Sequence, residues 1–193
     1  QGAIAANHVY RGLILRDETI VYAGQSGYIN YYLKNGSKAS VNDVVYSIDT
    51  DGDLSRQITT AVTDGTTLSQ EMLLEMAEEI DLFRNNYTSG HFSDVYAFKN
   101  RMDADLSQTL GVGALKELSD VVDSAEANKT FYRKKSDDTG IIVYYTDGYE
   151  NVTPDKVRAE LMSAVDYKKI PLDTRTEVSA GDAVYKRINS EEW

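Results

Sequence analysis

The residues that could carry chemistry are few and scattered along the chain. The two histidines, His8 and His91, lie far apart and in different expected elements, so a histidine metal site or catalytic base is not indicated. The absence of cysteine excludes disulfides, thiolate metal sites and cysteine nucleophiles. Adjacent carboxylates such as Glu78-Glu79 point to different sides of a helix, which argues against paired acid–base work. We therefore assign no catalytic, cofactor-binding or metal-binding residue, and we expect a protein that is not an enzyme and carries no cofactor.

One acidic run, Asp49-Thr50-Asp51-Gly52-Asp53, has the composition of a calcium loop. An EF-hand places its glycine sixth and an acidic residue twelfth, whereas here the glycine is fourth and the twelfth residue is Thr60. We interpret the run as a solvated junction between a strand and a helix.

Composition indicates a packed domain without a nucleic-acid partner. The chain has 193 residues, 41% of them hydrophobic and 26% charged, as in ordinary globular proteins. Its net charge of −11 would repel phosphates, and we find no basic stripe. No apolar run is long enough to span a bilayer, and the start lacks a methionine and a basic signal region. We therefore expect a piece of a longer protein, and the 14 tyrosines favour β-strands with one wet face.

An internal repeat links the segments 19–50 and 139–189. The matching runs are 26–32 with 139–145 and 41–48 with 180–188, the last with one extra residue before its isoleucine. Each copy reads as strand, turn, strand, and Asn35-Gly36 predicts the hairpin turn of the first copy. Because one such copy buries too little apolar area to stand alone, we expect the two copies to pair into one closed β-sandwich.

The residues between the copies, 51–128, predict helices. Apolar residues step by three or four through Leu68, Met72, Met76, Ile80, Phe83 and Tyr87. A second helix is expected at about 92–110 and a third at about 113–127, divided by Gly111 and Gly113. The methionine-bearing faces at Met72, Met76 and Met102 predict core packing, with an adaptable binding surface as the alternative. A further short helix is expected inside the second copy, at about 154–165, beginning after Thr153.

The first copy resembles half of a biotinyl/lipoyl domain, with a strand at 27–33, a turn at 34–36 and a strand at 41–49. In carrier domains of that family a lysine follows the last strand at the hairpin tip. Here the corresponding stretch is Thr50-Asp51-Gly52-Asp53, which has no lysine. Carriage of biotin or lipoate is therefore the least favoured function.

A lipoyl domain whose halves are separated by a helical insertion resembles the HlyD-like membrane fusion, or periplasmic adaptor, family. Segments 10–18, 140–150 and 181–186 are similar to its Gram-positive branch. The resemblance implies an α+β fold, a lipoyl-like β-sandwich or barrel assembled from two sequence-distant halves around a helical hairpin or three-helix insertion. We expect the first half at 8–50, the insertion at 51–129 and the second half at 130–193, where the chain stops before the family's β-barrel portion.

The function that this resemblance implies is a non-catalytic extracytoplasmic adaptor of a secretion or efflux system. Its helical insertion would contact an inner-membrane transporter, a cell-envelope protein or another copy of the chain, and a membrane anchor would precede residue 1. Two alternatives stay open beside it. One is a cell-envelope structural or ligand-binding module that uses a tyrosine-rich sheet face, at Tyr28, Tyr32, Tyr144 and Tyr149; the other is the carrier domain.

Overall fold

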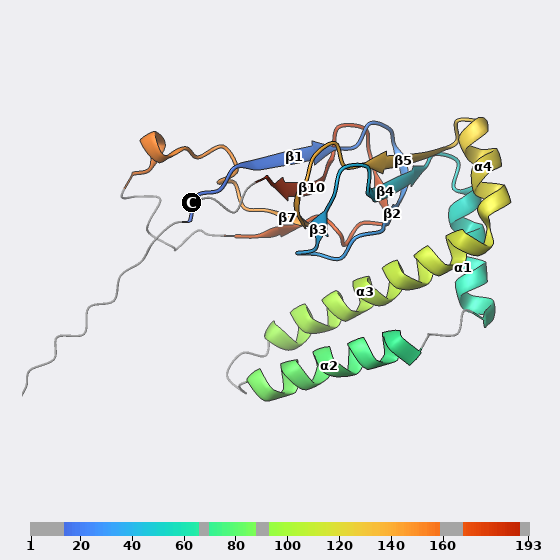
Figure 1. The fold of residues 1–193 in the computed structure, drawn as a ribbon, viewed down its shortest axis with the longest axis horizontal. Helices are drawn as coiled ribbons and strands as arrows, with labels where there is room; N and C mark the ends of the chain where they lie inside the picture. The colour runs from blue at the N-terminus through green and yellow to red at the C-terminus, as the bar shows by residue number, and fades with distance from the viewer. Residues whose placement is uncertain (1–13, 66–69, 88–92, 159–167, 190–193) are drawn as a thin grey trace, which may run out of the picture.

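The structure, a computed structural model, describes residues 14–65, 70–87, 93–158 and 168–189. Figure 1 shows a β-sandwich that carries a group of helices at one end, and two of these helices fold back along one side of the sandwich. The prediction of an α+β fold, with a lipoyl-like sandwich built from two sequence-distant halves around a helical insertion, is confirmed.

Within the described residues, ten short strands form two four-stranded sheets and one two-stranded sheet. They are β1 (Glu18–Tyr22), β2 (Gly27–Tyr31), β3 (Lys38–Ala39), β4 (Val44–Asp49), β5 (Phe131–Lys135), β6 (Gly140–Val143), β7 (Tyr145–Thr146), β8 (Ile170–Pro171), β9 (Glu177–Val178) and β10 (Ala183–Ile188). One sheet has the order β1-β10-β6-β3, the second β5-β4-β2-β9, and the small sheet pairs β7 with β8. Every pairing is antiparallel.

The repeat read from the sequence is a structural repeat in which the two halves exchange strands. β2 and β4 of the first half correspond to β6 and β10 of the second, and each pair forms the centre of one sheet. The outer strands come from the opposite half: β1 and β3 flank β10 and β6, while β5 and β9 flank β4 and β2. Neither half therefore completes a sheet by itself, which explains why both copies are needed for one fold.

The strands β4 and β10 match residue by residue without an insertion. Tyr28 lies opposite Asp49, and Ile141 lies opposite Ile188, so the two sheets keep the same register after Gly27 and Gly140. The extra residue expected before the isoleucine of the second copy is therefore wrong. In this register Lys186 takes the place that Ser47 has in the first half.

The turn at Asn35-Gly36 forms as predicted but leads elsewhere. The Ser37 amide donates to the Lys34 carbonyl at 3.0 Å, and Gly36 has a φ of 81°, a conformation that glycine adopts without steric cost. The turn delivers the chain to β3, which pairs with β6 of the other half. The expected direct hairpin to the 44–48 strand is thus interrupted by an exchanged strand.

Four helices form the described part of the insertion: α1 (Asp53–Gly65), α2 (Gln70–Asn86), α3 (Ser93–Glu117) and α4 (Ser119–Ala127). The expected break at Gly111 and Gly113 is wrong, because α3 continues through both glycines. Packing on either side of them outweighs the weak helix propensity of glycine. The helix expected at 154–165 begins as a short 3-10 turn, η1 (Pro154–Lys156), after which Val157 is extended. Most of the remaining positions, 159–167, lie outside the described residues.

Two hydrophobic cores hold these parts together. The larger lies between the two main sheets and includes Val45, Tyr46, Ile142, Val184 and Tyr185. The smaller lies where the helices meet the sandwich and consists of Leu54, Ile58, Ala114, Val122 and Phe131, with Leu115, Leu118, Val121 and Ala125 packed against it. The second core therefore fixes α1, α4 and the C-terminal end of α3 to strand β5.

Candidate functional site

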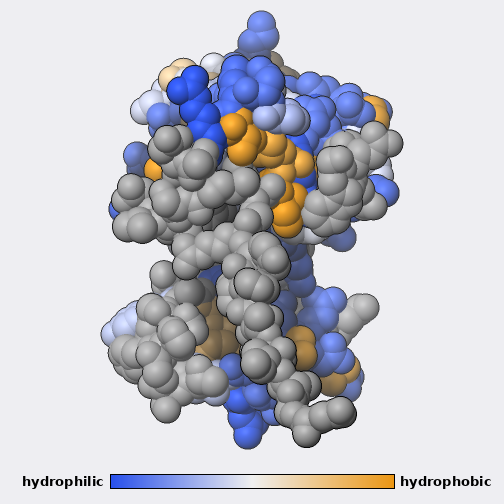
Figure 2. Space-filling view, turned by 90° about the vertical axis from the view of Figure 1, so that its left-hand side faces the viewer, coloured by the Kyte–Doolittle hydropathy of each residue, from blue (hydrophilic) through white to orange (hydrophobic). Residues whose placement is uncertain are grey.

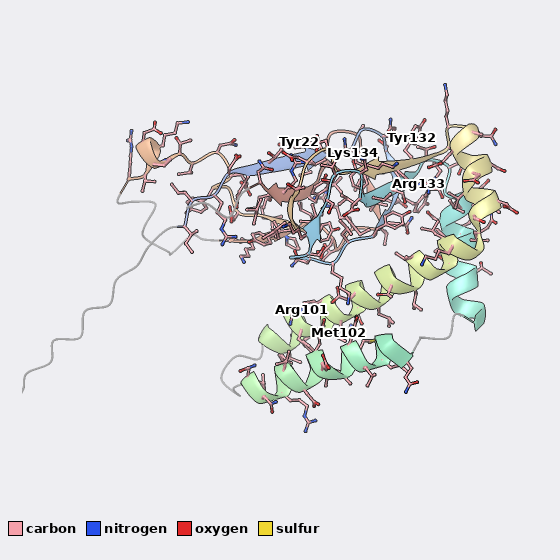
Figure 3. The ribbon with its side chains drawn as sticks, in the orientation of Figure 1. Tyr22, Arg101, Met102, Tyr132, Arg133 and Lys134 are labelled. Carbon is pink, nitrogen blue, oxygen red and sulfur yellow. The ribbon has the colours of Figure 1, made fainter. Side chains whose placement is uncertain are left out.

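The part of the insertion that extends furthest from the second core is α2 together with residues 93–110 of α3, called the arm below. The Phe83 and Phe98 rings stack across the two helices, with centroids 4.2 Å apart. Met76 and Met102 lie half-buried beside the same small cavity, and Figure 3 shows Met102 on α3 where the two helices face each other. The core-packing interpretation thus describes Met76 and Met102, whereas the side chain of Met72 lies outside the described residues.

The apolar face of α2 is wider than the surface that α3 covers. Leu73, Ile80 and Tyr87 recur at seven-residue intervals and remain 50%, 41% and 36% exposed. We call these three residues the outer row. Met76 and Phe83 stand between them in sequence and are half-buried. Of the apolar residues on α2, only the side that carries Met76 and Phe83 therefore packs against α3. In Figure 2 hydrophobic surface is visible on the arm as well as on the sandwich above it.

The arm touches the sandwich through a charged contact. Lys34 Nζ of the Lys34–Ser37 turn lies 2.8 Å from Glu75 Oε2 of α2. Glu79 and Asp105 line the same small cavity as this pair. The hydrogen bond from Glu75 raises the pKa of Lys34, and burial, followed by the charge of Glu79, raises the pKa of Asp105. Three acidic groups thus converge on one lysine where the arm meets the sandwich.

A second charge cluster is buried in the sandwich around Lys186 of β10. Its side chain is fully buried, and Nζ lies 2.8 Å from Glu18, 3.5 Å from Asp147 and 3.6 Å from Glu150. The Tyr145 ring centroid is 4.8 Å from the same nitrogen. Burial opposes the charge on Lys186, but the carboxylates, Glu18 foremost, outweigh it and raise its pKa. The cluster joins β1, β10 and the turn after β7.

The three carboxylates of this cluster approach one another closely enough to ligate a metal ion. The ammonium group of Lys186 lies among them, however, and takes the position that a cation would need. The protein's own cation therefore offsets part of the charge of the three carboxylates. Sequence reasoning missed this cluster because its members are distant in the chain. The available signal was a lysine inside the second-half strand, at the position where the first-half strand has Ser47.

The acidic run at 49–53 is a helix cap. Asp49 is 1% exposed, and its carboxylate accepts hydrogen bonds from the Gly52 amide at 3.1 Å and the Ser55 amide at 2.7 Å. The predicted junction between strand and helix is correct, but Asp49 is not solvated as expected. The stretch that would carry a biotinyl or lipoyl lysine leads directly into α1.

The tyrosines proposed for ligand binding do not share one exposed face. Tyr144 is buried, and its hydroxyl donates to the Leu33 carbonyl at 2.7 Å. The Tyr32 hydroxyl lies 2.8 Å from Ser47 Oγ, while Tyr28 is 38% exposed. The aromatic residues of this set thus include core residues, and the tyrosine-rich binding face is wrong. His8 and His91 lie outside the described residues.

No helix in the described ranges is both long and apolar enough to cross a membrane. Among known protein families, the one described as "RND related, barrel-sandwich hybrid domain" matches residues 18–189. Among curated proteins no sequence match was found. The crystal structure of ZneB from Cupriavidus metallidurans is similar at 13% sequence identity with a TM-score of 0.32, over 90% of this chain and 61% of that one. The chain thus spans less than two thirds of ZneB.

Proposed function

Because the chain belongs to the RND-related barrel-sandwich hybrid family, we propose that it is a non-catalytic adaptor of an efflux or secretion system. In this role the sandwich acts as a rigid spacer, and the arm contacts a partner protein. The division into a first half at 8–50, a helical insertion at 51–129 and a second half at 130–193 is part of the proposal. The proposal also places the protein outside the cytoplasm of a cell with a Gram-positive-type envelope, held by a membrane anchor outside this chain.

The observation that carries the proposal is the outer row of α2. Leu73 and Ile80 are large apolar residues on a helix held away from the second core, Tyr87 directly follows that helix, and α3 leaves all three exposed. Exposed apolar residues that align on one element are typical of protein–protein contact, whereas isolated ones are ordinary. Their alignment along one side of α2 therefore distinguishes them from scattered surface residues.

The spacing of the outer row favours a helix as the partner element. A seven-residue recurrence keeps apolar side chains on one seam when two helices wrap around each other at a small angle. A broad membrane-facing helix would need a wider apolar face and a basic polar side. The exposed face of α2 instead carries Glu78 and Asp81. An inner-membrane transporter, a cell-envelope protein or another copy of this chain would each meet the requirement if it presents a helix.

The proposal is tested by capture of partners from the native cell with the anchored protein. We expect Leu73→Glu together with Ile80→Glu to abolish recovery of the partner that the unaltered protein cross-links. Leu82→Glu is the matched control, because Leu82 is 62% exposed on the same helix but outside the row. Recovery of no transporter or envelope protein by the unaltered chain, or equal loss with the Leu82 variant, would contradict the proposal.

A further inference from the structure

The turn that follows β2 contains Asn35-Gly36, the single asparagine–glycine pair in the sequence. Asparagine is chemically labile, and a following glycine makes it more so, because no side chain keeps the glycine nitrogen away from the asparagine amide carbon. That nitrogen attacks Cγ, a cyclic succinimide forms, and the side-chain nitrogen leaves as ammonia. Water then opens the ring to aspartate or, mostly, to isoaspartate, whose backbone is longer by one methylene. The reaction therefore needs only water.

Burial does not protect this pair in the folded chain, since both residues are exposed. Two hydrogen bonds hold the reacting groups instead. The Gly36 amide donates to the Ile142 carbonyl at 2.7 Å, and the Asn35 side-chain oxygen accepts from the Tyr144 amide at 3.0 Å. The attacking nitrogen thus keeps its proton in a hydrogen bond, and the side chain that it would attack is held by a different backbone group.

Both hydrogen-bond partners belong to the second half of the sandwich. Ile142 lies in β6, and Tyr144, which follows that strand, is 109 positions beyond Asn35 in the chain. Two neighbouring bonds strengthen the same contact: the Ile142 amide donates to the Ser37 carbonyl at 2.9 Å, and the Tyr144 hydroxyl donates to the Leu33 carbonyl at 2.7 Å. The turn is therefore held in this way only while the second half is docked on it.

We propose that Asn35 is a deamidation site whose reactivity is controlled by closure of the sandwich. While β6 is docked, the hydrogen bonds keep Asn35 intact; when the two halves separate, the turn is free to react. Isoaspartate then lengthens the backbone before Gly36, so Gly36 and Ser37 no longer both reach Ile142 and the halves do not close again in the native register. The modification marks chains that have stayed open, whichever partner the arm contacts.

Peptide mass spectrometry of the whole chain, incubated at neutral pH with and without urea, measures the conversion. We expect Asn35 to react at least about tenfold more slowly in the folded chain, because two hydrogen bonds must first open. Tyr144→Phe removes the hydroxyl bond to the Leu33 carbonyl and keeps the amide, so it should raise the folded-state rate about two- to tenfold. Val122→Ala is the control, because it weakens the second core without touching the turn or β6, and it should leave the rate nearly unchanged.

Refolding of chains that were converted in urea tests the consequence. Chains with isoaspartate at position 35 should remain sensitive to protease, whereas the Asn35→Asp variant should fold, because its carboxylate still accepts from the Tyr144 amide. Equal rates in the folded and unfolded chain, equal acceleration by Val122→Ala and Tyr144→Phe, or full refolding of the isoaspartate chain would each overturn the proposal. None of these results bears on partner capture, which the outer-row variants test separately.

Discussion

Replacing Lys186 by methionine removes the buried cation while keeping a long unbranched side chain. Glu18, Asp147 and Glu150 then lose the ammonium group that lies 2.8, 3.5 and 3.6 Å from their oxygens. Their side chains are only 16%, 12% and 6% exposed, so water replaces it poorly. Removing one partner of a buried ion pair costs about 3–5 kcal/mol, which for a chain of this size lowers Tm by roughly 6–20 °C.

Thermal unfolding followed by circular dichroism at neutral pH measures this loss. Adding Glu18→Gln to Lys186→Met should recover part of it, because Glu18 lies closest and its charge then no longer lacks a partner. Lys38→Met is the matched control at an exposed site and should change stability by less than about 0.5 kcal/mol. A loss below about 1 kcal/mol for Lys186→Met, or no recovery in the double variant, would refute the view that the buried lysine stabilises the three carboxylates.

Three further substitutions address separate parts of the fold. Gly140→Ala should destabilise the chain by about 1–3 kcal/mol in urea unfolding, because its Cβ would lie 2.6 Å from the Ile188 carbonyl. Asp49→Ala should lower stability by about 1–2 kcal/mol through loss of the α1 cap, with Asp49→Asn retaining most of it. Asp105→Asn should raise Tm at pH 7, by a small amount because solvent screens the charge of a half-buried group. Burial, then Glu79, raises the pKa of Asp105, so the folded state favours its protonated form and ionisation at higher pH costs stability.

The outcomes that would contradict these expectations are distinct. An unchanged free energy of unfolding for Gly140→Ala would mean that β6 and β10 can move apart at no energetic cost. Equal stability of Asp49→Ala and Asp49→Asn would show that the hydrogen bonds of the Asp49 side chain do not stabilise α1. The benefit of Asp105→Asn must disappear as the pH falls below the ordinary aspartate value of 3.8; a benefit that persists there would have to come from something other than charge.

The repeat predicted the sandwich because its strands carry local signals. Alternating apolar residues, glycines and turn residues occur in the same order in both halves, and each strand or turn is specified by residues close to it in sequence. Strand exchange left no such signal, since a two-residue strand such as β3 looks the same whichever sheet it joins. The register error at Ile188 has the same origin: Ile188 was aligned with Ile48, whereas the hydrogen-bonded pairing matches it to Asp49.

The helical insertion was predicted less well because tertiary packing decides its boundaries. Gly111 and Gly113 are helix-weakening residues, yet α3 continues because both of its ends are held by other helices. The apolar spacing on α2 correctly identified Met76 and Phe83 as facing a neighbour. It could not show that Leu73, Ile80 and Tyr87 would stay uncovered, because periodicity gives the width of a face and not what packs on it. The buried cluster at Lys186 depends on contacts between distant segments and so had no local signature.

The exchange of strands between the halves sets the order in which a nascent chain can fold. β2 pairs with β9 and β1 pairs with β10, so both sheets wait for residues that leave the ribosome only after the whole helical insertion. The helices between them need only nearby residues and can form during translation. Closing the sandwich is then a late, slow step, during which unpaired strand edges stay exposed. Chaperone protection of the newly made chain would be most important in that interval.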